Sequence, residues 1–462
     1  MGESHEESRG NRRWVLGGAF LFFLVVGVGV GWLLTTITER QVQTAEFPLR
    51  IADIPDDEVD PAAWRVNFPR HYDSFMRTRE DVGRTPYAGT RGDYDKLAAN
   101  PFRQRAWAGY AFALEYNGIR GHHYAQIDQA ESRRTLEVSQ PGTCLNCHAA
   151  EAPLLIEELG WEEMNRTPYD SLRDEVHFGS SCRDCHESNT MELRISRPAF
   201  INAMERRGVD VTEASRQEMR SYVCAQCHVE YYFRGEDRIL TFPWDHGFEV
   251  EDIERHFDEY DFADWTHAET GAPMIKIQHP EWELYTTSVH YDAGVACADC
   301  HMPYTREGGV KVSDHWIRSP LTNLNNSCQT CHSISESELE QRVLRAQNRT
   351  AQLLATAEDA IIDLMDAIVE AQEAGVSGQA LEEARRYHRR SQLRWDFIDA
   401  ENSTGFHSPQ ESARILAHAA DLARRGELSA VRALNAHRLG RNASATEPQS
   451  GGGGSDEPGG RR

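Results

Sequence analysis

The sequence has no cysteine outside one repeated motif, and it is short of positive charge. All 10 cysteines lie in five Cys-x-x-Cys-His boxes, which argues against the zinc or thiol–disulfide chemistry that a single Cys-x-x-Cys pair permits. Lys and Arg number 49 against 73 Asp and Glu, a formal net charge of -24 over 462 residues. Phosphate binding needs a basic surface, so this balance argues against a nucleic-acid partner.

Each box has the residues that attach a c-type haem. The two thiols can add to the vinyl groups of the porphyrin, and the adjacent histidine can ligate the iron. The boxes comprise Cys144, Cys147 and His148; Cys182, Cys185 and His186; Cys224, Cys227 and His228; Cys297, Cys300 and His301; and Cys328, Cys331 and His332. The sequence therefore predicts five covalently bound haems. Their buried apolar mass suits a chain that is only 40% hydrophobic.

Residues 14–34 contain no charged side chain, enough to span a bilayer as a helix. Arg9, Arg12 and Arg13 precede this run, so the N-terminus is expected in the cytoplasm. A cleaved signal peptide is the alternative, but residues 35–38 offer no Ala-x-Ala-like site. We expect a cytoplasmic stub (1–13), a retained single-pass membrane anchor (14–37) and a tether (38–60). Either way, the boxes lie on the periplasmic or extracytoplasmic side.

The remaining chain divides by its periodicity. Residues 61–335 show no long helical or strand period, which predicts short helices and loops wrapped on haems. Residues 336–440 predict three helices, at about 336–374, 379–400 and 409–437, because apolar residues recur at steps of three and four. These helices are a natural homodimer surface, although they could pack only on their own domain. Residues 441–462 are predicted to be a disordered tail. The fold class is mainly α.

The histidine count bears on function. Of 20 histidines, five lie in the boxes and 15 lie outside. An electron-relay haem needs a second axial ligand, whereas catalysis on a small anion needs one iron with that position open. Four distal histidines would therefore describe a four-haem relay that feeds one open site.

Six segments carry a resemblance to a known family. They are Arg-Gly-His-His-Tyr-Ala (120–125), His-Val-Glu-Tyr-Tyr-Phe (228–233), Lys-Ile-Gln-His-Pro-Glu (276–281), the fourth box with its flanks (295–303), Ser-Asp-His (313–315) and His-Ser-Pro (407–409). The chain resembles the pentahaem cytochrome c nitrite reductases, which form ammonia from nitrite, over residues 106–416. The resemblance implies that His122 closes the third haem, His290 the fifth, His315 the second and His407 the fourth. The first haem is left open.

The resemblance also implies the catalytic residues. Tyr231 and His279 match directly, and counting from residue 122 gives Arg134 as the arginine, with Arg133 adjacent. A cation and a histidine over an open iron suit an anion that accumulates charge as N–O bonds break. Nitrite reduction to ammonium takes six electrons and eight protons at one place.

A calcium ion beside the first haem is implied as well. Its ligands would be side-chain oxygens of Glu230 and Gln278 and backbone oxygens of Tyr231 and Lys276, an all-oxygen set that suits a hard cation. His148 departs from the family's commoner pattern, which places lysine there. The departure puts the haem potential and the relative rates on nitrite, hydroxylamine and sulfite in doubt.

Two other functions remain open beside a nitrite reductase. One is an electron-transfer cytochrome with five closed haems; the other is a related multihaem reductase that acts mainly on hydroxylamine or sulfur oxyanions. The expected electron donor is a membrane quinol dehydrogenase or a cytochrome c. Of the unassigned histidines, His5, His388, His418 and His437 are predicted to lie at the surface.

Overall fold

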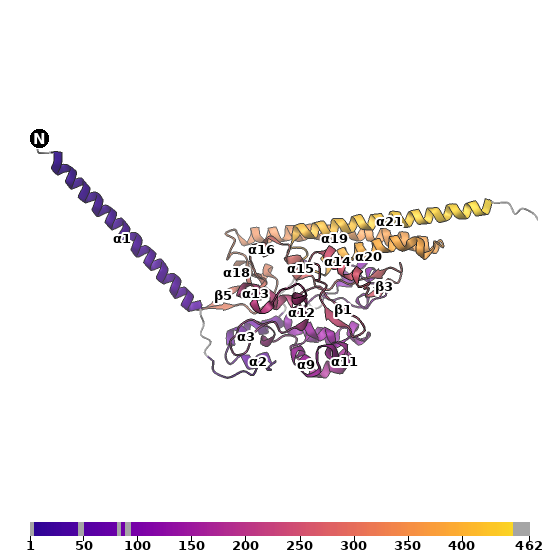
Figure 1. Ribbon diagram of the computed structural model, residues 1–462, viewed down its shortest axis with the longest axis horizontal. Coiled ribbons are helices and arrows are strands. Elements are labelled where there is room, and N and C mark those ends of the chain that lie inside the picture. Colours follow the sequence, from indigo (N-terminus) through magenta and orange to yellow (C-terminus); the bar gives the residue numbers. More distant parts are fainter. Residues whose placement is uncertain (1–3, 45–49, 81–84, 88–93, 447–462) are drawn as a thin grey trace, which may run out of the picture.

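The computed structural model describes residues 4–44, 50–80, 85–87 and 94–446. Its first element is a long helix, α1 (Ser4–Thr44), which projects from the rest of the chain (Figure 1). Between Trp14 and Ile37 the mean hydropathy is 2.3, and none of this apolar stretch is buried. Its length and composition suit a membrane span and equally a signal sequence. Residues 4–13 of the predicted stub and 38–44 of the predicted tether belong to the same helix.

Residues 50–335 form short elements joined by loops, as the lack of long periodicity predicts. The helices are α2 (Pro61–Trp64), α3 (Pro69–Met76), α4 (Lys96–Ala99), α5 (Phe102–Ala106), α6 (Ala125–Glu131), α7 (Arg133–Leu136), α8 (Leu145–His148), α9 (Ala152–Leu159), α10 (Trp161–Arg166), α11 (Tyr169–Leu172), α12 (Pro198–Arg206), α13 (Arg216–Ala225), α14 (Val250–Glu259), α15 (Glu281–Tyr285), α16 (Val289–Asp292), α17 (Cys297–His301) and α18 (Leu324–Ser327). Pro61, Pro69 and Pro198 each open a helix, where the fixed φ of proline is favourable and its missing N–H costs nothing.

Single 3-10 turns punctuate the same region. They are η1 (Arg77–Arg79), η2 (Ala111–Ala113), η3 (His122–Tyr124), η4 (Gly142–Cys144), η5 (Arg173–Glu175), η6 (Cys182–Asp184), η7 (Val211–Glu213) and η8 (Pro320–Thr322). Two of the five boxes begin inside such a turn, at Cys144 and Cys182. Short turns of this kind position side chains along a cofactor without requiring a continuous helix.

The strands of the described chain form three antiparallel hairpins. They are β1 (Tyr232–Arg234) with β2 (Ile239–Thr241), β3 (Trp265–Thr266) with β4 (Pro273–Met274), and β5 (Tyr304–Glu307) with β6 (Val310–Ser313). The first pairs Tyr232 with Thr241, and the second pairs Trp265 with Met274. Residues 230–231 precede β1 and residues 276–279 follow β4, so two hairpin ends present the predicted catalytic and calcium segments.

Three long helices cover one side of the haem-box region (Figure 1). They are α19 (Glu336–Glu373), α20 (Glu382–Ala400), which a 3-10 turn η9 (Gly378–Leu381) precedes, and α21 (Pro409–Thr446). Ser335 caps α19 by accepting a hydrogen bond from Glu338 N at 3.2 Å, and Gly375 follows its end at φ +88°. Of the apolar stripe that predicts α19, Ile361, Leu364 and Ile368 are fully buried, and Leu354 is partly buried. The mainly α fold class is thus confirmed.

Buried ion pairs connect these helices to the haem-box region. Arg394 of α20 is fully buried and donates to both carboxylate oxygens of Glu254 in α14, at 3.0 Å each. Arg103 of α5 donates from Nε to Asp399 at 2.9 Å and from a terminal nitrogen at 2.6 Å. Removing one partner of such a pair leaves an uncompensated buried charge, so these contacts strongly favour one docking geometry.

Two predictions about the helical region need correction. The third helix does not end near residue 437: α21 continues to Thr446, through the first residues of the predicted tail. Residues 447–462 lie outside the described residues. His388 is not at the surface but fully buried, where its ring nitrogens contact Thr270 Oγ1 at 3.0 Å and Gln392 Oε1 at 3.1 Å.

Candidate functional site

One cavity of about 3210 Å³ runs through the haem-box region. Its wall includes all ten cysteines and all five box histidines, together with the four predicted distal histidines, His122, His290, His315 and His407. The proposed catalytic residues Arg134, Tyr231 and His279 line the same cavity, as does Gln278. Residues from 122 to 407 therefore converge on one space that is large enough for several cofactors.

The predicted axial histidines meet in pairs. The ring centres are 6.2 Å apart for His122 with His228, and 6.3 Å apart for His315 with His186, His407 with His301 and His290 with His332. Bonds of about 2 Å from iron to nitrogen, plus about 1.1 Å from each nitrogen to its ring centre, put two axial imidazoles roughly 6.3 Å apart. The spacing of all four pairs therefore fits an iron atom between the rings.

The box histidine His148 has no such partner. Within the part of the chain that the structure describes, no second imidazole stands opposite it at this spacing. Its Nδ1 lies 2.9 Å from the backbone oxygen of Ala125 in α6. This contact holds the ring and leaves Nε2 to face the cavity.

Three other predicted ligands are held in the same way. Nδ1 lies 3.0 Å from Met191 O in His186, 3.1 Å from Arg318 O in His301 and 3.0 Å from Ser313 O in His315. Burial, with a second histidine close by, lowers the pKa of each of these three rings to about 4. They are therefore neutral at pH 7, and neutral imidazole is the form that binds a metal.

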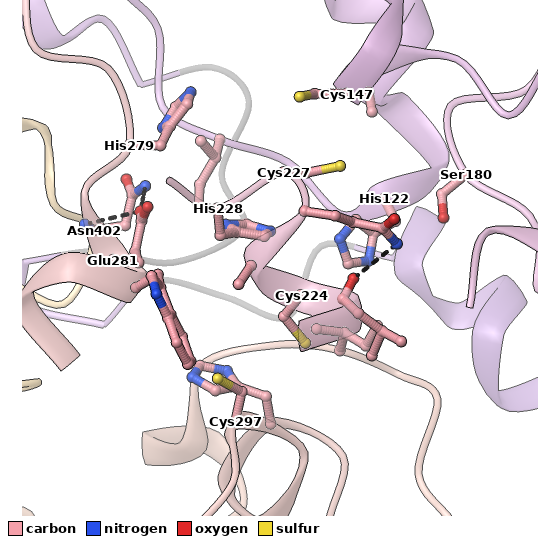
Figure 2. Close-up of a pocket in the computed structure, with 18 of the residues that line it drawn as sticks. His122, Cys147, Ser180, Cys224, Cys227, His228, His279, Glu281, Cys297 and Asn402 are labelled. Atoms are coloured by element: carbon pink, nitrogen blue, oxygen red, sulfur yellow. Dashed lines mark hydrogen bonds between the residues drawn. The ribbon is translucent and has the colours of Figure 1, made fainter. Parts of the chain in front are cut away.

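The boxes lie in a defined spatial order. Cys147 of the first box lies in the same pocket as Cys227 of the third, and Cys224 of the third is close to Cys297 of the fourth (Figure 2). Cys300 of the fourth box is in turn close to a cysteine of the fifth, Cys328. The third box thus neighbours the first and the fourth, and Cys185 of the second box also lies near Cys224, so the spatial order differs from the chain order.

Arg134 faces the first box. The hydroxyl of Ser132 caps α7 by accepting from Arg134 N at 3.2 Å, and the guanidinium carbon lies 4.1 Å from the centre of the Phe112 ring. Its positive charge acts to lower the pKa of Tyr231 and of the Cys144 thiol, although burial dominates and raises both. Among the described residues, no carboxylate lies within ion-pair range of Arg134. Its charge is therefore free for an anionic ligand.

Arg133 points elsewhere. Its Nε lies 2.7 Å from Glu137 Oε1, and both side chains are about half exposed, at 53% and 47%. It also donates to Leu114 O at 3.0 Å, and it is not part of the cavity wall. Of the two adjacent arginines, only Arg134 shares the cavity with His148.

Tyr231 and His279 approach the cavity from the two hairpin ends. Burial raises the pKa of Tyr231 well above 10, so the hydroxyl keeps its proton. Burial, followed by the nearby His228 and His148, lowers the pKa of His279 well below 6.5. Figure 2 shows the His279 imidazole and the Cys147 thiol projecting into the same pocket. A cation, a hydroxyl donor and a neutral imidazole therefore share one space with His148.

The predicted calcium ligands also lie together. Glu230 is fully buried; its Oε2 accepts from Gln278 N at 2.6 Å, while Oε1 has no hydrogen-bond partner. Gln278 Nε2 donates to Lys276 O, a predicted backbone ligand, at 3.2 Å. Among the described residues, no three His, Cys, Asp or Glu side chains group around a metal position, so a cation here would depend on amide and carbonyl oxygens. An orphaned buried carboxylate oxygen beside such oxygens fits a hard cation.

Lys276 also has a partner that the sequence did not indicate. Its buried ammonium group lies 2.8 Å from Asp396 Oδ1 in α20 and 4.6 Å from the centre of the Trp107 ring. The backbone N–H donates to Asp264 Oδ2 at 2.8 Å. The side chain is thereby tied to the helical region, which leaves the backbone oxygen directed toward Gln278.

Comparison with known proteins gives one consistent family. Residues 60–451 match the cytochrome c552 family. A cytochrome c-552 of Porphyromonas gingivalis is 40% identical over 425 residues, which cover 90% of this chain and 84% of the relative. A cytochrome c-552 of Desulfotalea psychrophila is 35% identical over 436 residues, which cover 90% of this chain and 84% of the relative.

One solved structure is similar over most of its length. It is a cytochrome c nitrite reductase of Desulfovibrio desulfuricans, with a TM-score of 0.78 and 33% identity over 86% of this chain and 90% of that one. Two calcium sites are described in the catalytic subunit of that enzyme.

Proposed function

This chain belongs to the cytochrome c552 family of pentahaem nitrite reductases, and we propose that it catalyses the six-electron reduction of nitrite to ammonium. One observation carries the proposal. Four predicted axial pairs have the ring spacing of two imidazoles on one iron, while His148 stands without a histidine opposite and shares its cavity with Arg134, Tyr231 and His279. That arrangement suits four relay haems and one reactive haem.

The haem assignment follows the boxes. Family membership implies covalent haem c, and we assign one haem to each of the five boxes. His122, His290, His315 and His407 would supply the second axial ligands of the third, fifth, second and fourth haems. Bound in the cavity, these groups would supply one-electron redox centres and, at the first box, an iron position open to an anion. The contact from His148 Nδ1 to Ala125 O supports ligation through Nε2.

The surrounding side chains have separate tasks. Arg134, which has no carboxylate competitor in the described chain, attracts nitrite and stabilises negative charge as the N–O bonds break. Tyr231 keeps its proton and donates a hydrogen bond to the bound anion. His279 is neutral at rest, accepts a proton on one ring nitrogen and passes it to the substrate oxygen. Because each turnover consumes eight protons, His279 must be protonated again from water after each transfer.

We assign a calcium ion to the oxygens of Glu230, Tyr231, Lys276 and Gln278. The unpartnered Oε1 of Glu230 and the two calcium sites of the Desulfovibrio desulfuricans enzyme support this assignment. A cation there would compensate the buried carboxylate and hold together the two segments that carry Tyr231 and His279.

The N-terminal helix and the C-terminal helices support a proposal for location and partners. We propose that α1 is retained as a single-pass anchor with its N-terminus in the cytoplasm, so that the haem domain faces the periplasm or the outside. Electrons would come from a membrane quinol dehydrogenase or a cytochrome c. The long helices α19 and α21 offer a surface for a homodimer.

Spectroscopy with turnover separates this function from an electron-transfer cytochrome. The oxidised protein should show one high-spin haem beside low-spin haems, and nitrite should drive oxidation of a reduced viologen. A wholly low-spin spectrum without nitrite-dependent oxidation would overturn the enzyme assignment. Comparing initial rates on nitrite, hydroxylamine and sulfite at equal enzyme concentration tests the remaining alternative, a reductase of hydroxylamine or sulfur oxyanions.

A further inference from the structure

The loop between α20 and α21 is built around one buried carboxylate, that of Glu401. The residue is 2% exposed, and its side chain turns back into its own loop. Oε1 accepts from Ser403 N at 3.0 Å, and Oε2 accepts from Ser403 Oγ at 2.7 Å and Gly405 N at 3.2 Å. Gly405 has a φ of +76°, and a Cβ there would lie 2.5 Å from Thr350 Oγ1, so the loop has little freedom to rearrange.

The same carboxylate contacts a predicted haem ligand. Glu401 Oε1 lies 2.6 Å from His407 Nδ1, and His407 N donates to Ser403 Oγ at 2.9 Å. Both the ring and the backbone of His407 are therefore tied to the Glu401 loop. Because His407 Nε2 is the nitrogen left for iron, Glu401 acts on the far side of the ring.

This contact differs from those of the other predicted ligands. His148, His186, His301 and His315 each place Nδ1 against a neutral backbone carbonyl. Within the described residues, His407 alone of the nine histidines assigned to haem lies within 4 Å of a carboxylate. The fourth haem would thus have an axial ligand with an anionic partner.

We propose that Glu401 is a positioning residue that makes His407 a strongly electron-donating ligand and lowers the reduction potential of the fourth haem. The inference rests on the proposed function, in which His407 closes the haem of the fourth box. The carboxylate oxygen lies at ion-pair distance from Nδ1, although outside the geometry of a hydrogen bond, and its charge makes the ring more electron-rich than a neutral carbonyl does. More electron density then reaches the iron, and the oxidised state is stabilised. Three donors from the loop stabilise the carboxylate as an anion in spite of its burial.

The position of the fourth haem suggests why a low reduction potential would help electron transfer. The fourth box lies close to the third, at Cys297 and Cys224, and close to the fifth, at Cys300 and Cys328. The third box in turn lies close to the first. A haem of low potential between the third and fifth passes its electron on readily, which favours delivery toward the first box over storage at the fourth.

The test is potentiometry on Glu401→Gln in the full-length holoprotein. Glutamine keeps the size but offers only a neutral acceptor, like the carbonyls beside the other ligands. At a fixed potential, the ratio of reduced to oxidised haem at one low-spin centre should rise about tenfold, which for a one-electron couple is about 59 mV. The other couples should not move.

Glu358→Gln is the matched control. Glu358 is a carboxylate of α19 that accepts from Asn100 Nδ2 at 2.8 Å and Trp395 Nε1 at 3.1 Å, and in the described part of the chain no histidine pairs with it. Glu358→Gln makes the same substitution at a carboxylate remote from the axial ligands and should leave the potential of every haem unchanged. If Glu401→Gln keeps all five haems and no couple shifts, or if Glu358→Gln shifts the same couple equally, the inference is wrong.

Two further measurements cover the case in which Glu401→Gln loses a haem and the case in which His407 is not a ligand. If Glu401→Gln loses a haem, the EPR spectrum of the oxidised wild-type protein decides: one low-spin species must have a stronger ligand field than the other three, and four equal ligand fields would overturn the proposal. His407→Ala tests the underlying assignment separately. It should convert one low-spin haem to high spin, and an unchanged spin state would remove His407 as a ligand, whatever the role of Glu401.

Discussion

Arg134 and Arg133 are neighbours in sequence with opposite environments, so replacing each by glutamine is a controlled experiment. Arg134 lines the cavity beside the first box and has no carboxylate partner among the described residues. Arg133 is exposed and paired with Glu137. The prediction is that Arg134→Gln impairs nitrite reduction severely, whereas Arg133→Gln does not.

The size of the loss follows from the charge. A guanidinium about 4 Å from an anion contributes about 4 kcal/mol at an effective dielectric constant of 20. Loss of one preorganised donor from a water-excluded site lowers the rate by about 10²–10³. We therefore expect kcat/KM for nitrite to fall about 10²–10³-fold in Arg134→Gln and to stay within about twofold of wild type in Arg133→Gln.

The assay is nitrite-dependent oxidation of a reduced viologen, with the haem content of each variant measured by the pyridine haemochrome method. Equal haem content ensures that activity is compared between fully loaded proteins. The assignment fails if Arg134→Gln retains wild-type kcat/KM with five haems attached, or if Arg133→Gln loses as much.

Three further predictions concern neighbouring features. His279→Asn should lose most nitrite turnover with all five haems attached, because a neutral proton shuttle is removed; unchanged turnover would exclude the residue from the mechanism. Prolonged chelation should lower both turnover and Tm, and added calcium should restore them in wild type but not in Glu230→Gln; full activity after verified calcium loss would contradict the site. Burial raises the pKa of Glu254, but Arg394 and Arg390 outweigh it and hold the pKa below 4.5, so its stabilising effect is present above that pH and lost on acidification. Glu254→Gln should therefore reduce the free energy of unfolding by about 3–5 kcal/mol near pH 7. The gap between wild type and variant should shrink as pH falls below 4.5. A gap that does not change with pH would count against the ion pair.

The helical region shows what local sequence patterns can and cannot predict. Leu354, Ile361 and Ile368 repeat with the period of a helix, and that information is contained in the segment itself, so α19 was predicted within a residue. The predicted end of α21 lies too early in the chain: Gly440 follows it closely but does not stop the helix, which continues to Thr446. Helix ends depend on capping and packing that a composition change does not specify.

Burial of polar residues was the harder problem. His388 lies between arginine pairs in the sequence, a context typical of a solvated helix face, yet Thr270 from a distant turn covers it. The same holds for Asp396 as the partner of Lys276, 120 residues away, and for Glu401 beside His407. Such contacts arise only when the chain is folded, because hydrophobic periodicity carries no information on which buried polar groups meet.

The haem ligands, unlike the buried polar contacts, could be predicted from the sequence because the motifs that define them are local. Each box specifies its own two thiols and histidine, and the distal histidines were placed by family resemblance. The four ring spacings support those pairs, and the separate environments of Arg134 and Arg133 support the former as the catalytic arginine. The spatial order of the boxes could not be predicted, because the first and third boxes are close in space although the second box separates them in the sequence.

The most direct measurement is product analysis on the purified holoprotein, with electrons counted as reduced viologen consumed per nitrite. If four haems relay electrons to one open site at the first box, each nitrite should consume six electrons and yield one ammonium ion. Consumption of fewer electrons with release of a nitrogen oxide, or no consumption of nitrite by protein that contains five haems, would contradict the proposed function.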